Sequence, residues 1–319
     1  MYYIGIDLGG TNIAAGIVNS EYKIIEKGSV PTGAERDGKL VIKDMAELCK
    51  SLLDRAGLSV DDIEYAGIAS PGTANPDTGV IEYSNNLHFK DFPICEVLKS
   101  YIPFKKVYVE NDANAAAKGE AVVGAAKGVR DAVMITLGTG VGGGVIIDGK
   151  IYSGFNFAGA ELGHTVIEYN GRQCSCGRRG CWEAYSSATG LINMTREKLD
   201  ECKQNGRETL MTAIVEKEGK VSGRTAFAAM KQGDAAGAEV VDMYLNYLAC
   251  GLSNMINIFM PEILVIGGGI SNERDNLLNP LNEKIQKETY GSRTSKATVL
   301  KCAELGNDAG IIGAAVLGF

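Results

Sequence analysis

The chain has 319 residues, which is enough for two domains, or one large domain, with a well-buried core. Its 32 basic and 39 acidic residues give a formal net charge of −7, and without a basic run or stripe this argues against nucleic acid as a ligand. The N-terminus lacks the pattern of a signal peptide, and the apolar tail from Ile311 to Phe319 is too short to span a bilayer. We therefore expect a cytoplasmic protein without a membrane partner.

The first part of the chain predicts β-strands followed by a helix. Residues 2–30 resemble strands that are broken by Gly9-Gly10-Thr11-Asn12 and by Asn19-Ser20-Glu21. This pattern indicates a meander rather than a strand followed by a helix. Residues 39–56 then show the apolar spacing of a helix.

A strand–loop–strand pattern follows. A strand is predicted over residues 64–69, and it ends in Ser70-Pro71-Gly72. A loop rich in Asn, Pro and Gly precedes another short strand over residues 106–110. Asn111-Asp112 then begins an Ala-rich helix, and Gly128 is predicted to end it.

The next segment repeats the first. Ile6 to Thr11 aligns with Ile135 to Gly140 at a constant offset of 135 − 6 = 129 residues. Each copy is predicted to be a strand, a glycine turn and a returning strand. Two such copies predict a duplicated fold with a cleft between its halves.

The rest of the chain is mainly helical. The predicted helices lie at residues 190–205, 224–231 and 234–259, with a last one from Asn307. A buried strand over residues 263–266 ends in Gly267-Gly268-Gly269. A triple glycine after a strand usually indicates a tight approach of two backbones.

Residues 138–150, which contain the second group of glycines, resemble two nucleotide-binding motifs in spacing. Gly138 to Gly143 has G-x-G-x-x-G spacing, but a dinucleotide-binding dehydrogenase needs a helix after the glycines. Val145 to Lys150 instead indicates a β-branched strand with an Asp-Gly hairpin turn. Gly144 to Lys150 also resembles a P-loop, but Ile151 stands where a magnesium-binding Ser or Thr is required. Neither motif is therefore expected.

The two glycine turns are candidates for holding phosphate. A tight turn between strands can aim several backbone N–H groups at one point, and glycine leaves room for a phosphate oxygen. Gly9-Gly10-Thr11 and Gly138-Thr139-Gly140 both fit. Asp7 ends a buried strand beside the first turn, where Mg²⁺ with its waters would bridge it to phosphates. The alternative is an Asp that only caps a turn, and the repetition of the motif argues against it.

A cluster of cysteines indicates a metal site. Cys174, Cys176 and Cys181, with His164 upstream, supply three thiolates and one imidazole, the ligands of a closed tetrahedral zinc site. Four protein ligands leave no open position, so the predicted zinc is structural. The alternative is three buried free thiols and an unrelated histidine, since disulfides are not expected in this context.

Phosphoryl transfer to an alcohol needs a base near the hydroxyl, and Asp112 is the candidate. It lies where the predicted strand turns into a helix, so its side chain can face a ligand. Asn111 beside it offers both a donor and an acceptor to a sugar hydroxyl. The alternative is that Asp112 only caps the helix N-terminus.

These motifs resemble two groups of known proteins. Asp7 to Thr11, Thr136 to Gly140 and Gly267 to Gly269 resemble the two phosphate loops and the adenosine loop of the actin and sugar-kinase ATPase superfamily. Glu161 to His164, followed by Cys174 to Glu183, resembles the ROK family (repressors, open reading frames, kinases). The resemblance covers nearly the whole chain.

The resemblance implies an α/β fold of the two-domain, duplicated actin-like ATPase (ribonuclease-H-like) type, with the active site in a cleft between the domains. The implied small N-terminal domain comprises residues 1–118 plus 305–319. The implied large domain comprises residues 119–304 and carries the zinc loop and the adenosine-binding part. Family members are often dimers or tetramers, so a homo-oligomer is expected.

The resemblance also implies an ATP-dependent kinase that phosphorylates the 6-hydroxyl of glucose, with Asp112 as the catalytic base. The implied sugar-binding residues are Gly72, Asn86, Asn111, Asp112, Glu161, His164 and Glu183. The implied residues for ATP and Mg²⁺ are Asp7, Gly9, Gly10, Thr11, Asn12, Thr136, Gly138, Thr139, Gly140, Gly267, Gly268 and Gly269. The implied zinc ligands are His164, Cys174, Cys176 and Cys181, with one zinc per chain.

Alternative functions remain open at this point. Kinases of N-acetylmannosamine, N-acetylglucosamine, mannose, fructose and allose share these motifs, and some relatives also use polyphosphate. A sugar-sensing repressor is a different class, and such proteins carry a helix-turn-helix domain ahead of the first strand. Because this sequence begins directly with that strand, a repressor is disfavoured.

Overall fold

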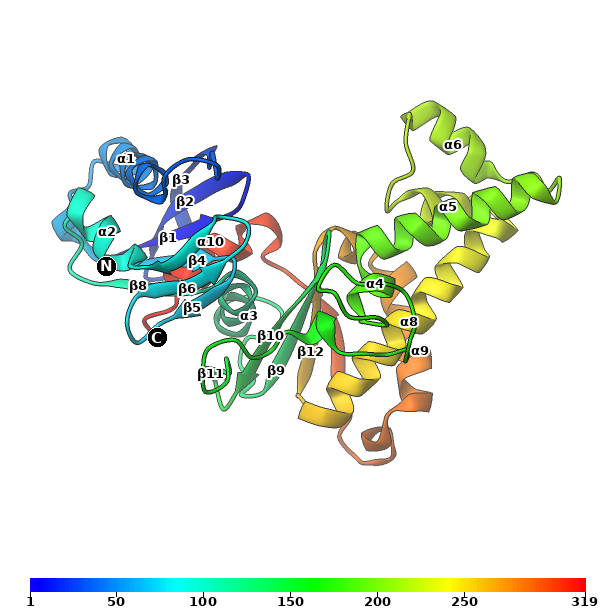
Figure 1. The fold of residues 1–319 in the computed structure, drawn as a ribbon. Coiled ribbons are helices and arrows are strands. Elements are labelled where there is room, and N and C mark those ends of the chain that lie inside the picture. Colours follow the sequence, from blue (N-terminus) through cyan, green and yellow to red (C-terminus); the bar gives the residue numbers. More distant parts are fainter. The chain divides into compact units, whose positions relative to one another are not determined.

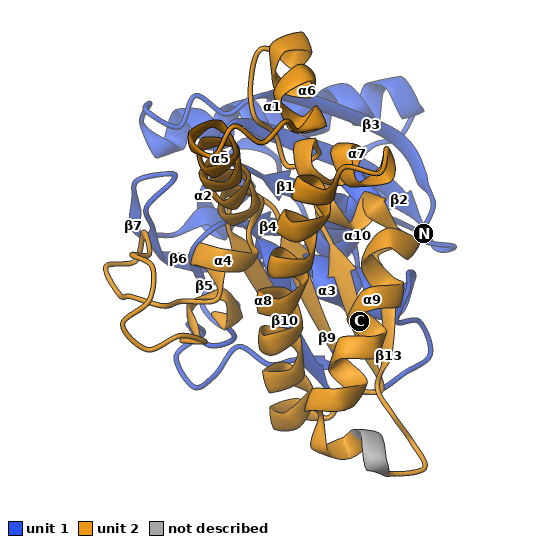
Figure 2. Ribbon diagram, turned by 90° about the vertical axis from the view of Figure 1, so that its right-hand side faces the viewer, with its two compact units in different colours: residues 1–132, 144–160, 304–319 blue, residues 133–143, 161–303 orange. Residues whose placement is uncertain are grey.

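The computed structural model describes residues 1–291 and 294–319. The chain forms two compact units, which Figure 2 shows in different colours. Unit 1 consists of residues 1–132, 144–160 and 304–319, and unit 2 consists of residues 133–143 and 161–303. The domain boundaries expected near residues 118 and 304 stay a prediction.

Unit 1 contains a five-stranded sheet in the order β3-β2-β1-β4-β8. The strands are β1 (Tyr2–Leu8), β2 (Asn12–Asn19), β3 (Ile24–Pro31), β4 (Ile63–Ser70) and β8 (Val107–Asn111). The first three strands pair antiparallel, and β4 and β8 extend the sheet in parallel. The predicted meander is therefore confirmed.

Helices cover both faces of this sheet (Figure 1). The helices of unit 1 are α1 (Gly38–Ala56), α2 (Ile94–Tyr101), α3 (Asp112–Val122) and α10 (Ala309–Ala315). Ile4 and Ile6 of β1 share a core with the apolar stripes of α1 and α2. Gly5 lies between them and faces the other way, as strand geometry requires. A Cβ on Gly5 would lie 1.8 Å from the Ile311 carbonyl oxygen, so α10 packs directly on this strand.

Two expectations for this unit are wrong. The segment after Gly72, expected to be a loop, contains a three-stranded sheet of β5 (Thr73–Asn75), β6 (Val80–Ser84) and β7 (Phe89–Phe92). These strands are too short to show an alternating pattern, and turn residues separate them. The helix that begins at Asp112 ends at Val122 rather than at Gly128.

The second sheet repeats the topology of the first. Its order is β11-β10-β9-β12-β13. The strands are β9 (Ala132–Leu137), β10 (Val141–Ile147), β11 (Lys150–Ile151), β12 (Ile263–Gly267) and β13 (Val299–Cys302). In both sheets the first three strands of the chain segment lie side by side, and two later strands extend the sheet beyond the first of them. The predicted duplication is confirmed, and a strand rather than a helix follows the glycines of residues 138–143.

The remaining helices belong to unit 2. They are α4 (Glu183–Ser186), α5 (Ala188–Gln204), α6 (Leu210–Glu218), α7 (Thr225–Lys231), α8 (Ala235–Phe259) and α9 (Asp275–Glu288). The three helices predicted between residues 190 and 259 are confirmed as α5, α7 and α8. Helix α9 was not predicted, and it contains Pro280, a residue that usually ends helices. Trp182 is fully buried against Gly251 of α8, where a Cβ would lie 2.0 Å from its ring.

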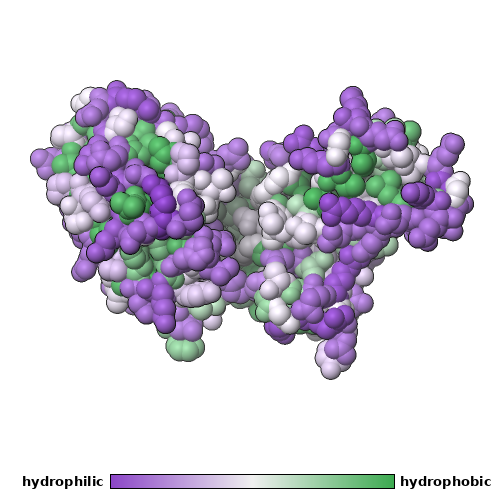
Figure 3. Space-filling view, turned by 45° about the horizontal axis from the view of Figure 1, so that its top comes forward, coloured by the Kyte–Doolittle hydropathy of each residue, from purple (hydrophilic) through white to green (hydrophobic). Residues whose placement is uncertain are grey.

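The visible surface of both units is mostly hydrophilic, with hydrophobic areas interspersed (Figure 3). Among the described residues, none of the helices combines the length and the apolar character needed to cross a membrane.

Candidate active site and metal cluster

The first glycine loop joins β1 to β2 and is held by the end of β3. The Gly9 N–H donates to the Asn12 carbonyl at 3.0 Å, which closes the turn. Thr32, which is fully buried, donates its hydroxyl to the Gly9 carbonyl at 2.6 Å, and its N–H donates to the Thr11 carbonyl at 2.9 Å. The carbonyls of the loop are therefore turned into the protein, and Gly10 and Thr11 are exposed.

Asp7 lies on the face of β1 that α10 covers. A Cβ on Gly310, at the start of α10, would lie 2.3 Å from the Asp7 Oδ2 atom, so the carboxyl group sits against the helix N-terminus. Burial and, to a smaller extent, the negative charge of Asp112 together raise the pKa of Asp7 to about 6. The two carboxyl groups of unit 1 that the sequence singled out are thus close enough to repel each other.

Asn111, rather than Asp112, caps α3. The Asn111 side-chain oxygen accepts hydrogen bonds from the N–H groups of Ala113 and Asn114 at 2.9 and 3.2 Å. The interpretation of Asp112 as the helix cap is therefore wrong, because Asp112 is the first residue of the helix itself. Its carboxylate accepts from the Ala113 N–H at 2.8 Å, and the residue is partly desolvated although some of its surface stays exposed.

The environment of Asp112 suits a base. Desolvation by the surrounding protein raises the pKa of Asp112. The hydrogen bonds to its carboxylate, among them the one from the Ala113 N–H, lower the pKa but do not cancel this effect. A carboxylate whose pKa moves toward neutrality accepts a proton more readily than an ordinary Asp.

Two residues orient Asn111. The Asn111 amide donates to the Gly72 carbonyl at 3.1 Å, and Gly72 has a φ of 100° with no room for a Cβ. Glu110 is buried, and its carboxylate accepts from the Asn111 N–H at 2.9 Å and the Asn114 side-chain amide at 3.1 Å. Burial raises the pKa of Glu110. The supporting role of Glu110 was not predicted, because its sequence position only indicated a strand end.

Asn86 lies next to the first glycine loop. It follows β6 in the turn before β7, and its Cβ is 3.7 Å from the position that a Cβ on Gly10 would take. Unit 1 therefore brings a predicted sugar-binding residue beside a predicted phosphate loop.

The second glycine loop, between β9 and β10, is held by residues 183–189, which we call the bracing segment. The Gly138 N–H donates to the Gly140 carbonyl at 3.0 Å and closes the turn. The bracing segment makes three hydrogen bonds to the loop: Ala188 N–H to the Gly138 carbonyl at 2.8 Å, the Thr189 hydroxyl to the Thr139 carbonyl at 2.8 Å, and Val141 N–H to Glu183 Oε2 at 3.0 Å. The sequence did not predict these contacts.

The triple glycine, Gly267-Gly268-Gly269, lies beside the end of β9, where the second glycine loop begins. Gly267 ends β12, and Gly268 has a φ of 83°. A Cβ on Gly268 would lie 2.3 Å from the Leu137 carbonyl oxygen, whereas one on Gly269 would meet nothing within 4 Å. Unit 2 therefore places the predicted adenosine loop next to Thr136 and the second phosphate loop, with open space at Gly269.

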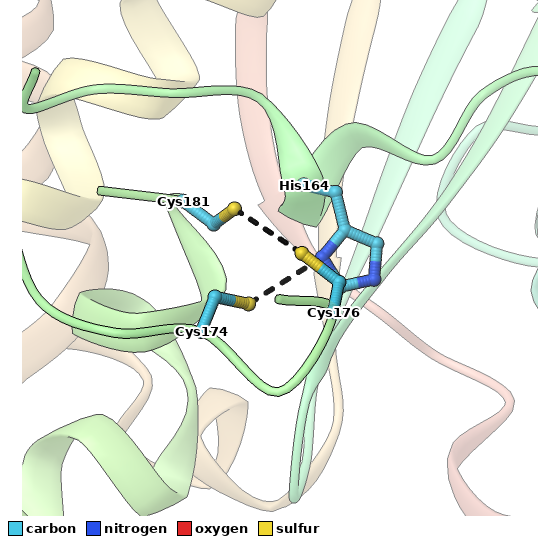
Figure 4. A group of neighbouring side chains, drawn as sticks. All are labelled: His164, Cys174, Cys176 and Cys181. Carbon is cyan, nitrogen blue, oxygen red and sulfur yellow. Dashed lines mark hydrogen bonds between the residues drawn. The ribbon is translucent and has the colours of Figure 1, made fainter. Parts of the chain in front are cut away.

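The predicted metal ligands come together in unit 2 (Figure 4). The ligand atoms of His164, Cys174, Cys176 and Cys181 all lie within 4.8 Å of one another. Cys174 Sγ is 3.7 Å from His164 Nδ1, and Cys176 Sγ is 3.6 Å from Cys181 Sγ. This group of three thiols and one imidazole can hold a metal ion.

Glu161 and Glu183 flank the cluster. Glu161 is exposed and precedes the short 3₁₀ helix Leu162–His164, which carries the imidazole. Glu183 begins α4, and its Oε1 atom accepts from the Ser175 hydroxyl at 3.2 Å. Its other oxygen accepts from the Val141 N–H. One carboxylate therefore links residues 174–181, which we call the cysteine loop, to the second glycine loop.

The predicted site residues thus form one set in each unit. The set in unit 1 comprises Asp7, Gly9, Gly10, Thr11, Asn12, Gly72, Asn86, Asn111 and Asp112. The set in unit 2 comprises Thr136, Gly138, Thr139, Gly140, Glu161, His164, Cys174, Cys176, Cys181, Glu183, Gly267, Gly268 and Gly269. The roles of these residues in catalysis and binding stay predictions.

Comparison with known proteins gives consistent matches. The profile of the ROK family matches residues 3–318. A Thermotoga maritima protein named glucokinase is 37% identical over 313 residues, 98% of this chain and 95% of that protein. A Halalkalibacterium halodurans protein named glucokinase is 36% identical over 314 residues, 98% of this chain and 93% of that protein. The crystal structure of a ROK family glucokinase from Streptomyces griseus, in complex with glucose and AMPPNP, has a TM-score of 0.81 at 29% identity and covers 99% of both chains.

Proposed function

The chain belongs to the ROK family, and we propose that it is an ATP-dependent kinase that phosphorylates the 6-hydroxyl of glucose. The observation that carries the proposal is the N-terminus of α3, where Asn111 is the cap and Asp112, the first helical residue, is exposed and has a raised pKa. The similarity to proteins named glucokinase, and to a structure that holds glucose and AMPPNP, supports glucose and ATP as the substrates.

In the proposed reaction Asp112 acts as the general base. Its carboxylate takes the proton of the sugar 6-hydroxyl while that oxygen forms a bond to the γ-phosphorus of ATP. The bond between the γ-phosphorus and the β,γ-bridging oxygen breaks, and its electron pair leaves with ADP. The raised pKa of Asp112 favours the acceptance of this proton.

The glycine loops supply the contacts to phosphate. In each loop the carbonyls are turned inward by hydrogen bonds, which leaves backbone N–H groups to face a ligand. Asp7 would hold Mg²⁺ through its waters, and its pKa of about 6 is that of a crowded carboxyl group without a cation. When bound with ATP, Mg²⁺ neutralises charge on the phosphates.

We propose zinc as the ion of the cysteine cluster. A tetrahedral zinc with Zn–S bonds of about 2.3 Å requires sulfurs about 3.8 Å apart. The Cys176–Cys181 sulfur separation of 3.6 Å fits this requirement, and Cys174 Sγ is 3.7 Å from His164 Nδ1, close to the distance of about 3.6 Å that one Zn–S and one Zn–N bond would give. Four protein ligands leave no position for substrate, so the role of the zinc is structural.

In this proposal the sugar is bound by groups that pair with hydroxyls, carried by Asn86, Asn111, Glu161, His164 and Glu183. Polyols are recognised by such paired donors and acceptors, and a site of this kind rejects analogues that lack a hydroxyl.

A coupled assay with MgATP across a panel of sugars tests the proposal. We expect the highest kcat/KM for glucose rather than for mannose, fructose, allose or the N-acetylhexosamines. Asp112→Asn should lower kcat by at least about a hundredfold, the low end for general-base catalysis. Asp44→Asn, which removes a surface carboxylate paired with Arg36, serves as the control. Near-normal turnover of Asp112→Asn would overturn the assignment of Asp112 as the base. A higher kcat/KM for another sugar would overturn the assignment of glucose as the substrate.

A further inference from the structure

We infer that the bracing segment, residues 183–189, positions the second phosphate loop, and that Thr189 is a positioning residue for ATP. The inference rests on the proposed function, because it assumes that Gly138-Thr139-Gly140 receives the phosphates. It goes further by connecting the cysteine loop to the nucleotide, whereas the family resemblance connects it to the sugar.

The bracing segment contacts the loop along its whole length. Its hydrogen bonds reach Gly138, Thr139 and Val141. Gly140 makes no such bond, but a Cβ at this position would lie 2.3 Å from Glu183 Oε2. The glycine is therefore packed against the carboxylate, and no residue of the loop is left without a contact to the segment.

The hydrogen bonds hold the loop in an orientation that suits an anion. The bracing segment engages the carbonyls of Gly138 and Thr139, which would repel phosphate if they faced it. Among the described residues, the N–H groups of Thr139 and Gly140 have no hydrogen-bond acceptor. These two groups are the donors that a phosphate oxygen would use, and the bracing segment keeps them available.

The bracing segment is in turn tied to the metal cluster. It begins two residues after the ligand Cys181, and Glu183 accepts from the Ser175 hydroxyl at 3.2 Å between two further ligands. On the other side of the loop, Gly163 precedes the ligand His164, and a Cβ on Gly163 would lie 2.2 Å from the Val141 carbonyl oxygen. Val141 is thus held by two parts of the metal cluster's surroundings: its N–H bonds to Glu183, and its carbonyl packs against Gly163.

Thr189 allows a clean test, because its side chain is exposed and takes no part in the predicted sugar or metal sites. Thr189→Val keeps the shape and removes the hydroxyl that donates to Thr139, whereas Thr189→Ser keeps the hydroxyl. Thr298→Val is the matched control, because the Thr298 hydroxyl donates to the Pro261 carbonyl at 2.7 Å, a similar bond elsewhere in unit 2.

Calorimetry with AMPPNP and MgCl₂, together with the KM values for ATP and glucose, gives the readout. Thr189→Val should raise the dissociation constant of AMPPNP and the KM for ATP about three- to tenfold, the scale of one lost hydrogen bond. The KM for glucose should change less than about twofold on the same reasoning, because the sugar-binding groups are untouched. Thr189→Ser should restore ATP affinity, and Thr298→Val should leave it unchanged.

The outcomes separate the inference from the proposed function. Normal AMPPNP binding by Thr189→Val, or an equal loss of affinity for ATP and glucose, would overturn the inference alone. A wild-type chain that does not bind AMPPNP would overturn both. Thermal unfolding of each variant checks that the fold is retained.

Discussion

The two phosphate loops have similar sequences and the same strand–turn–strand setting, but they are supported in different ways. In each loop the first glycine closes the turn with its N–H, and a threonine hydroxyl from outside holds one carbonyl. In the first loop that threonine is Thr32, a fully buried residue directly after the neighbouring strand β3. In the second loop it is Thr189, an exposed residue of the bracing segment.

Similar glycine motifs therefore need not be equally stable. The first loop is supported by the sheet that carries it, so it should keep its shape whenever unit 1 is folded. The second loop depends on a segment that follows a loop of low apolar content, which a metal ion organises in the proposed function. The first loop also has carboxyl groups beside it, Asp7 and Asp112, and the position that corresponds to Asp7 in the second copy is Thr136.

The largest effect is expected from the carboxyl group beside the first loop. The pKa of Asp7 is raised from 3.8 to about 6, so the unliganded native state binds this proton more tightly than the unfolded state does. The resulting stabilisation is present below pH 4 and is lost as the pH rises through 6. Asp7→Asn avoids the buried charge and should stabilise the unliganded protein at pH 7 by up to about 3 kcal/mol, at about 1.4 kcal/mol per unit of pKa.

Denaturant unfolding of wild type and Asp7→Asn between pH 4 and pH 7 measures this difference. It should grow as the pH rises, and MgATP should reverse it, because only the wild type keeps the carboxylate for Mg²⁺. Asp44→Asn controls for the loss of a surface charge. A difference that stays constant with pH would contradict the assignment of the raised pKa to Asp7.

Loss of the metal site should disturb the second loop and spare the first. Cys176→Ser removes one ligand and should lower the affinity for zinc by at least about ten- to a hundredfold, the range for altered surroundings of a metal, and the loss of zinc should weaken AMPPNP binding. Hydrogen exchange followed by mass spectrometry should show faster exchange at residues 138–141 and unchanged exchange at residues 9–12. Metal analysis should find about one zinc in the wild type and less in the variant, because four ligands close the site.

A cysteine outside the cluster provides the control. Cys250→Ser should change neither the metal content nor the exchange of either loop, because Cys250 lies in α8 and is not among the four ligands. Equal acceleration of both glycine loops in Cys176→Ser would show that the metal supports the whole fold rather than the second loop.

The last comparison concerns the two threonines themselves. Thr32→Val removes a hydroxyl bonded to the Gly9 carbonyl in the interior, and we expect a loss of about 1 to 3 kcal/mol in the free energy of unfolding. Thr189→Val removes an exposed bond and should cost less stability while it weakens ATP binding. Equal losses of stability in the two variants, measured by urea unfolding, would remove the distinction between the loops.

The sequence alone determined the features that depend on neighbouring residues. The turn residues that divide residues 2–30, the glycines and the offset of 129 residues were enough to predict two strand–turn–strand copies, and the two sheets share one strand order. The spacing of His164, Cys174, Cys176 and Cys181 was enough to predict a cluster, which the fold forms. A hairpin and a short ligand loop close over few residues, so their pattern is local.

Tertiary structure decided the features that depend on distant residues. The short strands β5 to β7 exist because they pair with one another, and α9 forms despite Pro280 because its apolar side packs on α8. Asn111 is the helix cap rather than Asp112, and that choice involves the Gly72 carbonyl 39 residues earlier. The support of each phosphate loop comes from Thr32 or from residues 183–189, and no local pattern marks those positions, because a side-chain hydroxyl finds its acceptor only after the chain has folded.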